Sequence, residues 1–301
     1  MEKTIQVIHQ DLTNPSSIKP DVTFPNLELL IDQIIISADK AYKIYNVEGK
    51  VHEALMSLSG NVGQDDLKDD LLKIYPSKII PESLHPQGTY LTVVKQFDSG
   101  LAFVFFTLKK SSEFNSETGI VTKYLTHFYN IVFVPKNSNR IEVRVCSKTP
   151  KNDIDDSFRQ TINVFYDYVG SKGIDLRNAK EISFYKCIES FYLDKNAGRA
   201  ASVVMSTDEQ SSDATLSNKK VRDYCARTQL VHDNSGNNHS YKCRAVNIRW
   251  PLLEEKQCEM QVTIEPHKNL WEREICNHIS VKHPESLLRL NRLISDVISR
   301  A

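Results

Sequence analysis

The sequence predicts an α+β protein, in which N-terminal helices precede a central antiparallel β-meander and a second, smaller α+β unit ends in a helix. Two observations predict this class. Segments with apolar residues every three or four positions lie at both ends, and four segments rich in β-branched and aromatic residues lie together in the centre. The 301 residues are about twice a typical domain. We therefore expect two domains, residues 1–150 and 151–301, with a boundary at residues 149–152.

The N-terminal part is expected to be mainly helical. Asn26 is a favourable N-cap residue, and apolar residues recur behind it at helical spacing. They are Leu27, Leu30, Ile31, Ile34, Ile35 and Ala38. We also expect a strand at residues 4–8 and shorter helices near residues 52–58 and 64–74.

The centre of the chain predicts a four-stranded antiparallel meander. Its segments are rich in β-branched and aromatic residues, and each connection carries turn residues such as Gly, Asn, Asp or Ser. The strands are expected at residues 89–97, 101–110, 122–134 and 140–146, with turns at 98–100, 115–119 and 135–139. On the last strand Ile141, Val143 and Val145 should face one side, and Arg140, Glu142, Arg144 and Cys146 the other.

The C-terminal half is expected to begin with two helices. An apolar stripe starts near Asp153 and ends at Gly170 and Gly173, which suit a helix C-terminus. Asn178 with Glu181 three residues later resembles a capping box, so a second helix should begin there.

A second β-rich region and a last helix complete the chain. Strands are expected at residues 199–205, 241–250 and 259–264, separated by polar loops at 206–218 and 232–240. Pro284 and Glu285 favour a helix start, and the residues behind them form an apolar face. Its members are Leu287, Leu290, Leu293, Ile294, Val297 and Ile298. We expect this helix to belong to the core.

Composition predicts a folded, cytoplasmic protein with no membrane segment. The mean hydropathy is −0.39, and the longest apolar stretches, such as residues 101–108, are far shorter than the ~20 residues of a spanning helix. The first residues lack the pattern of a signal peptide. The scattered cysteines are therefore expected to be free thiols of a reducing compartment. They are Cys146, Cys187, Cys225, Cys243, Cys258 and Cys276.

The strongest functional signal is a cluster of cations at residues 219–249, here called the basic region. Lys and Arg balance Asp and Glu over the whole chain, at 38 each. The basic region nevertheless contains seven cations against two acids, Asp223 and Asp233. The cations are Lys219, Lys220, Arg222, Arg227, Lys242, Arg244 and Arg249. Clustered cations attract phosphates, and the nearby Tyr224, Tyr241 and Trp250 could stack on bases. The region therefore predicts a DNA or RNA interface.

Two groups of residues have the ligand types of a zinc site. One is Cys225, His232, His239 and Cys243, and the other is Cys276, His278 and His283. Zinc sites usually place two ligands on one tight turn, and neither group has such a pair. We therefore expect no metal, and no other motif predicts a cofactor.

A metal-dependent nuclease is the enzyme class that comes nearest to the sequence. That chemistry needs carboxylates and a lysine on adjacent strands. Residues 140–144 have Arg, and residues 259–261 have Gln, at the position of the lysine. Nucleophile motifs and phosphate-binding glycine loops are missing from the sequence as well. The sequence therefore favours a binding protein over an enzyme and predicts no catalytic residues.

Three function classes remain open at this stage. The first is a non-enzymatic nucleic-acid-binding accessory or sensor protein that uses the basic region. The chain has the general character of bacterial accessory proteins found beside phage-defence genes, so anti-phage defence is one expected role. The second class is a protein–protein adaptor or oligomerising subunit that uses the aromatic-rich sheet and associates with itself or with another protein. The third is an unrecognised metal-dependent nuclease.

Overall fold

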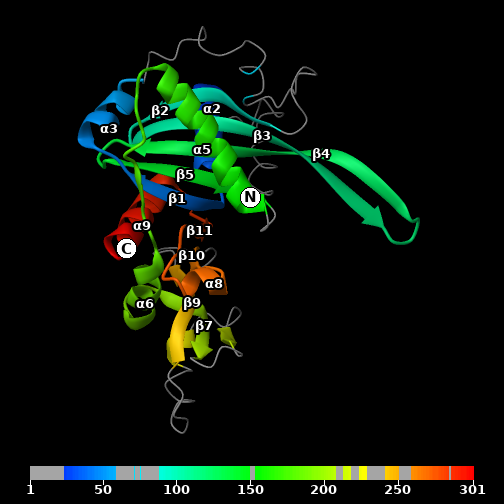
Figure 1. Cartoon of the computed structure of the whole chain (residues 1–301), viewed down its shortest axis with the longest axis vertical. Coiled ribbons are helices and arrows are strands. Elements are labelled where there is room, and N and C mark those ends of the chain that lie inside the picture. The colour runs from blue at the N-terminus through cyan, green and yellow to red at the C-terminus, as the bar shows by residue number, and fades with distance from the viewer. Residues whose placement is uncertain are drawn as a thin grey trace, which may run out of the picture.

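The computed structural model describes residues 24–58, 71, 75, 88–149, 153–207, 213–217, 224–228, 241–250, 259–284 and 286–301. These residues form the predicted α+β fold around one antiparallel sheet of eleven strands (Figure 1). The strand order is β2-β3-β4-β5-β1-β11-β10-β9-β7-β8, and β6 pairs with β1 beside this path. The strand expected at residues 4–8 and the helix at 64–74, apart from Leu71, lie outside the described residues.

The predicted meander is confirmed. It consists of β2 (Gly88–Phe97), β3 (Gly100–Asn115), β4 (Ile120–Pro135) and β5 (Arg140–Cys146), paired in chain order. The turn between β3 and β4 occupies residues 116–119, so both strands are longer than the sequence predicts. The polar end of β3, which includes Ser112, is a poor strand former by itself. It is held in register by β4, whose β-branched and aromatic residues pair with it up to Asn115 and Ile120.

Alternate residues of the central strands bury into two separate cores. On β3, Phe103 and Phe105 belong to one core and Ala102 and Val104 to the other. On β5, Ile141, Val143 and Val145 share the first core, as the alternation predicts. Arg140, Glu142 and Arg144 on the opposite face of β5 are also buried, which the sequence does not predict. Their charges are compensated within the protein, since the carboxylate of Glu142 pairs with Arg140 at 2.8 Å and with Arg144 at 2.7 Å.

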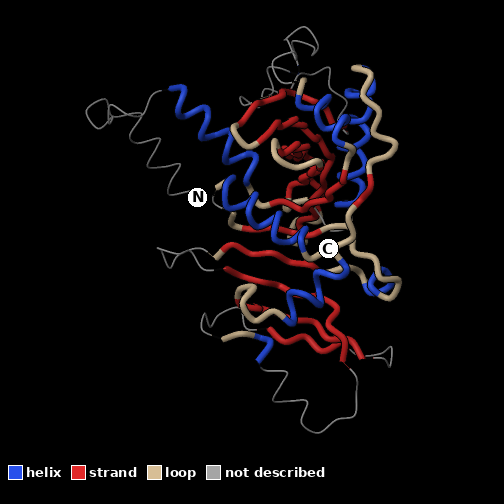
Figure 2. Tube along the Cα trace, turned by 90° about the vertical axis from the view of Figure 1, so that its left-hand side faces the viewer, coloured by secondary structure: helices blue, strands red, loops and turns tan. Residues whose placement is uncertain are grey.

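Each face of the sheet is covered by its own helices. The first core is closed by α3 (Gly49–Met56) and α5 (Ile154–Ser171). The second is closed by α2 (Phe24–Ser37), α6 (Tyr185–Leu193) and α9 (Leu287–Ser299). The side view shows the sheet curling at the end made by the meander (Figure 2). A short helix, α8 (Lys268–Trp271), precedes the last strand.

The last helix lies where the sequence predicts it, but it begins at Leu287 rather than at the predicted start, Pro284 and Glu285. Ser286 caps it by accepting a hydrogen bond from the backbone N–H of Arg289 at 3.2 Å. Its apolar face is buried in the second core and consists of Leu287, Leu290, Leu293, Ile294 and Val297. The core role expected for this helix is therefore confirmed.

The ladders on β1 join the two halves of the chain. Strand β1 (Lys40–Asn46) pairs with β5 on one side and with β11 (Ile279–Lys282) on the other. From β11 the sheet continues through β10 (Met260–Ile264), β9 (Tyr241–Trp250), β7 (Arg199–Thr207) and β8 (Asp213–Ser217). Both proposed halves thus share a sheet, and a division into residues 1–150 and 151–301 stays a prediction.

Several elements differ from the sequence-based prediction, and β1, α8 and β11 are not expected from it. The helix expected at Asn178 begins only at Tyr185. In its place β6 (Lys180–Glu181) pairs with β1, and the N–H of Ile182 donates to the carbonyl of Ile44 at 2.8 Å. Strand β8 lies within the loop predicted at residues 206–218, because β7 offers its outer edge there.

Candidate functional site

The basic region is described in part. Lys219, Lys220 and Arg222 lie outside the described residues, and the other four cations lie within them. Lys242 is exposed on β9. The remaining three are arginines whose side chains are engaged within the protein, and they are taken in turn below.

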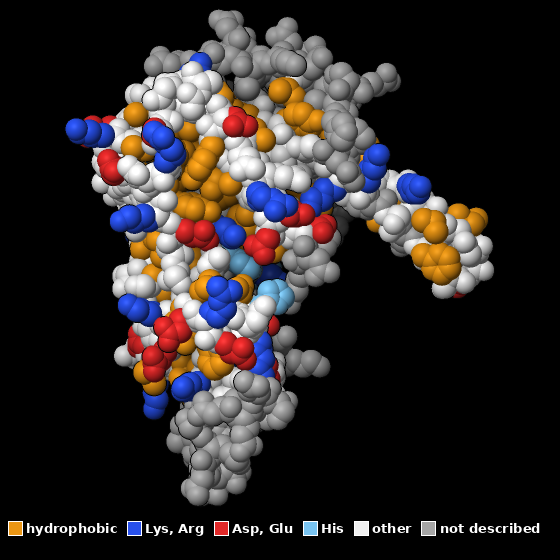
Figure 3. Space-filling view, in the orientation of Figure 1, with side chains coloured by type: hydrophobic (Ala, Val, Ile, Leu, Met, Phe, Trp, Pro, Cys, Tyr) orange, Lys and Arg blue, Asp and Glu red, His pale blue; other side chains and the backbone are white. Residues whose placement is uncertain are grey.

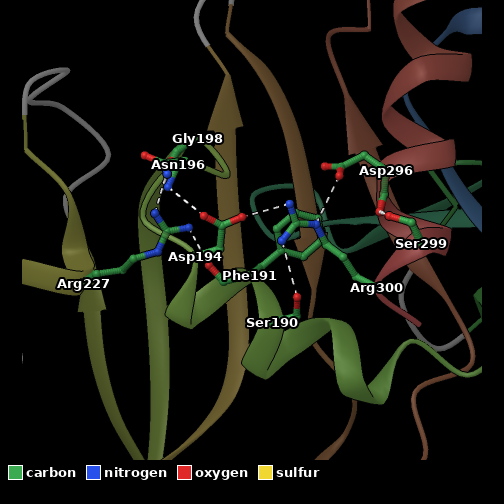
Figure 4. A network of polar contacts seen from close by, with 9 residues as sticks. All are labelled: Ser190, Phe191, Asp194, Asn196, Gly198, Arg227, Asp296, Ser299 and Arg300. Atoms are coloured by element: carbon green, nitrogen blue, oxygen red, sulfur yellow. Dashed lines mark hydrogen bonds and ion pairs between the residues drawn. The ribbon is translucent and has the colours of Figure 1, made fainter.

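Arg227 is buried and holds two chain segments together. Its Nη1 donates to the carbonyl of Gly198 at 2.7 Å, and its Nη2 donates to the carbonyl of Phe191 at 2.6 Å (Figure 4). The residue is only 4% exposed. These carbonyls belong to the end of α6 and the start of β7, so Arg227 has a structural role at this junction.

Arg300 completes the same network from the last helix. Its guanidinium pairs with Asp194 at 3.0 Å and with Asp296 at 3.2 Å, and it donates to Ser190 Oγ at 3.4 Å (Figure 4). It also stacks on the ring of Phe191 at 4.6 Å. The pKa of Asp194 is lowered, first by the N–H of Asn196 and then by Arg300. The network fixes the end of α6 to the end of α9.

Arg244 and Arg249 are each paired with a carboxylate. Arg244 Nη2 lies 2.9 Å from Asp213 on β8, and its Nη1 donates to the carbonyl of Pro266. Arg249 is the cross-strand neighbour of Arg199 in the β7–β9 ladder. Glu259 contacts both, at 3.4 and 2.7 Å. Burial raises the pKa of Glu259, but hydrogen bonds and charge from the two arginines outweigh it and lower the pKa.

The candidate metal ligands do not form a metal site within the described residues. No group of three or more His, Cys, Asp or Glu side chains in that part of the chain is placed to hold a metal ion. His232 and His239 lie outside it. All five described cysteines are free thiols. Burial raises the pKa of Cys243 and of Cys276 to about 12, which disfavours the thiolate form that binds metal.

The two segments compared with a nuclease, residues 140–144 and 259–261, each contain one acid, Glu142 and Glu259, and both acids are engaged by arginines. Glu142 has no exposed surface, and its two carboxylate oxygens accept hydrogen bonds from Arg140 and Arg144. Glu259 is held between Arg199 and Arg249. Each carboxylate therefore neutralises arginines rather than facing an open metal position.

A cluster of titratable groups that the sequence analysis did not identify lies between β1 and the start of α5. Lys43 pairs with Asp155 at 3.3 Å and lies over the ring of Phe158. The same ring lies 6.0 Å from that of His278. Burial lowers the pKa of His278 and raises that of Glu181, and both groups also feel Lys43 and Asp155. Burial thus favours the neutral forms of both, and the ion pair closes the helix–sheet junction.

The β3–β4 hairpin projects from the body as a two-stranded ribbon (Figure 1). We call residues 109–126 the arm. The pairing of β2 with β3 ends at Leu108, and that of β5 with β4 covers only residues 131–133. Within the described residues, the arm strands therefore have only each other as ladder partners.

The arm carries exposed apolar side chains, and Figure 3 shows some of them on one side of it. They are Phe114 at 64%, Ile120 at 60%, Val121 at 53%, Leu125 at 48% and Tyr124 at 44% exposure. Residues paired directly across the ladder lie on the same face, and successive residues of a strand alternate between the two faces. Phe114 pairs with Val121, so these two side chains share one face, whereas Tyr124, which pairs with Ser111, lies on the other. The arm thus holds five of the nine large hydrophobic residues exposed in the described part of the chain.

The base of the arm is fixed by polar contacts. Asn130 Nδ2 donates to Thr107 Oγ1 and to Thr161 Oγ1, both at 3.1 Å, and its Oδ1 accepts from the N–H of Cys146. Buried Lys40 donates to the carbonyl of Tyr129 at 2.8 Å. Beside these contacts lies a cavity of about 230 Å³. Its lining residues are Leu108, Lys109, Lys110, Asp153, Asp156 and Gln160.

The arm is a difference from the sequence-based prediction, in which residues 111–121 form a connection between two shorter strands. The available signal was the run of β-branched and aromatic residues from Ile120 to Leu125, next to a turn that has Gly119 at φ 68°. Residues 120–125 are exposed because β3 and β4 extend beyond their neighbours β2 and β5. The alternation of apolar and polar residues in the sequence does not predict the lengths of these strands.

No helix in the described residues is both long enough and apolar enough to cross a membrane. Comparison of the chain with protein-family models, with curated proteins and with solved structures found no match.

Proposed function

We propose that this protein is a non-enzymatic oligomerising or adaptor subunit, and that the arm is its contact surface. The supporting observation is the exposure of apolar side chains on both faces of the arm, far from the two cores. Clustered exposed apolar residues on a folded protein typically mark an interaction site.

The geometry of the arm favours a partner that covers it. An isolated two-stranded ribbon is only marginally stable in water, and additional strands or a packed face stabilise it. Phe114, Val121 and Leu125 lie on one face, and Ile120 and Tyr124 on the other. A partner that lies flat on one face would leave the apolar side chains of the other face in water. A partner at the edge or around the tip reaches side chains of both faces, so the proposal favours such a contact.

A triple substitution on one face tests this proposal. The arm variant Phe114→Ser, Val121→Thr, Leu125→Thr keeps the strand polarity pattern but removes the apolar face. The matched control is Leu193→Ser with Leu288→Ser, which removes two side chains that are 66% and 62% exposed elsewhere. We expect the wild type and the control to elute from native extract above the 34.4 kDa monomer, and the arm variant as the monomer. Equal elution of all three folded proteins would contradict the proposal.

We propose nucleic-acid binding through the basic region as a second function, supported by its seven cations against two acids. Three arginines of the region have internal partners, so the weight of this proposal falls on Lys219, Lys220 and Arg222. Changing these three residues to Ala should weaken binding to DNA or RNA and reduce its salt dependence. Asp213→Asn, which removes a partner of Arg244 rather than a cation, is the control. Unchanged affinity and salt slope in the triple variant would reject this interface.

A further inference from the structure

We infer that two copies of this chain pair through the outer edge of β4, as an antiparallel ladder of residues 120–124 around a two-fold axis. The inference rests on the proposed function of the arm and names its partner as a second copy. It makes a four-stranded ribbon in the order β3-β4-β4-β3, with the two β4 strands at its centre.

The outer edge of β4 is open where the inference needs it. For residues 120–125 the ladder partner in the described part of the chain is β3 alone. Strand β5 does not follow β4 outward, because the N–H of Cys146 donates to the side chain of Asn130 and the N–H of Ser147 donates to the carbonyl of Asp39. An unpaired strand edge is a template for pairing with another strand.

Composition distinguishes the two edges of the arm. On β3, residues 109–115 contain three charges, Lys109, Lys110 and Glu113, and charged residues on an edge strand discourage pairing. On β4, residues 120–125 contain one charge, Lys123, among β-branched, aromatic and aliphatic residues. Such a segment pairs readily with other strands, including copies of itself.

Symmetry and charge then select the register. In an antiparallel pair of identical strands, a local two-fold axis passes through one residue and its own copy. An axis at Lys123 would place two ammonium groups opposite each other, which is unfavourable. An axis at Thr122 places Thr opposite Thr, Lys123 opposite Val121, and Tyr124 opposite Ile120. Threonine pairs and aromatic–β-branched pairs are both favourable across strands.

Pairing of the two edges also shields apolar surface. In the ladder Tyr124 of one copy lies directly opposite Ile120 of the other, and these side chains are 44% and 60% exposed in the single chain. The pairing therefore covers the flanks of these side chains, while both faces of the ribbon keep contact with water. The two-fold arrangement keeps Phe114, Val121 and Leu125 of both copies on one continuous face.

Single cysteine substitutions test the register directly. In the inferred ladder the Cα atoms of the two Thr122 residues lie about 5 Å apart, which a disulfide can span, whereas those of Lys123 lie beyond its ~7 Å limit. Under mild oxidation we expect Thr122→Cys to give a reducible species of twice 34.4 kDa. Lys123→Cys is the matched control and should stay at the mass of one chain, as should the parent with its native cysteines. Equal cross-linking at both positions would overturn the inference.

Light scattering on the purified protein provides the second measurement. The wild type should be a dimer, and Tyr124→Lys should be a folded monomer with a cooperative thermal transition. A monomeric wild type without a Thr122→Cys cross-link would overturn self-pairing. In that case a complex in extract that depends on the arm would preserve the proposed function with another partner. Loss of both signals would reject the self-pairing and the proposed function together.

Discussion

The side-chain oxygen of Asn130 accepts a hydrogen bond from the backbone N–H of Cys146 at 3.1 Å, at the point where β5 stops pairing with β4. A side chain thus replaces the next rung of the ladder. The amide group of Asn130 also donates to two threonines, so one residue both ends the β5 ladder and joins β3, β4 and α5 at the base of the arm.

Replacing Asn130 with Ala should destabilise the protein. The change removes three hydrogen bonds and leaves the N–H of Cys146 without this acceptor, at a cost of about 2–3 kcal/mol. Chemical denaturation would measure the loss in the free energy of unfolding. Asn196→Ala is the control, because Asn196 is exposed and bonds Asp194 through its backbone N–H. A loss at position 130 no larger than at position 196 would contradict the role of the amide.

Removing Arg227 should affect folding rather than the binding of an anionic partner. Arg227→Ala leaves the carbonyls of Phe191 and Gly198 without their charged donor, and such losses cost about 3 kcal/mol or more in total. We expect a lower thermal midpoint for this variant and an unchanged one for Lys242→Ala, which removes an exposed cation of the same region. A wild-type midpoint for Arg227→Ala would show that the two carbonyl contacts do not hold the junction.

The buried amino group of Lys40 predicts a pH dependence of stability. Desolvation by burial lowers the pKa of Lys40 from 10.5 to about 8. Between these values the unfolded state binds more protons than the folded state, so this residue makes the free energy of unfolding rise with pH. The full change is roughly 3 kcal/mol. Denaturation of wild type and Lys40→Met should give a difference that grows in favour of the wild type from pH 8 to 10.5. A constant difference across that range would argue against a lowered pKa.

Two neighbouring leucines of α9 offer a test of its core role. Leu290 is fully buried, whereas Leu288 is 62% exposed. Leu290→Ala should lower the free energy of unfolding by about 2–5 kcal/mol, and Leu288→Ala by less than about 0.5 kcal/mol. Urea denaturation of both variants would measure the two losses. Equal losses would mean that the buried face of the helix is assigned wrongly.

The parts of the fold that could be predicted are those with strong local patterns. The meander has alternating β-branched residues and glycine or asparagine at its turns, and α5 and α9 have apolar stripes with clear ends. Strand β1 was missed because Lys40 and Lys43 break its apolar pattern, although the sheet buries Lys40. Strand β11 has only four residues, and its existence depends on the open edge of β1, which is distant in the sequence.

The candidate sites show the same limit more sharply. A count of charges gives seven cations at residues 219–249, but it contains no information on their partners. In the structure Arg249 pairs with Glu259, and Arg244 pairs with Asp213. The count also cannot distinguish a solvated arginine from Arg227, whose guanidinium bonds buried carbonyls. These partners come from segments that only the folded structure brings together, so they cannot be predicted from the local sequence.

The position of β1 between β5 and β11 has a consequence for synthesis of the chain on the ribosome. The first described strand can pair with β5 soon after that strand emerges, but residues 40–42 on its other edge must wait for residues 279–282. At typical elongation rates this delay is on the order of ten seconds. Throughout it, the nascent N-terminal half presents an open strand edge with apolar neighbours, the kind of surface that chaperones shield. Completion of the sheet is therefore tied to the emergence of residues 279–282 from the ribosomal tunnel.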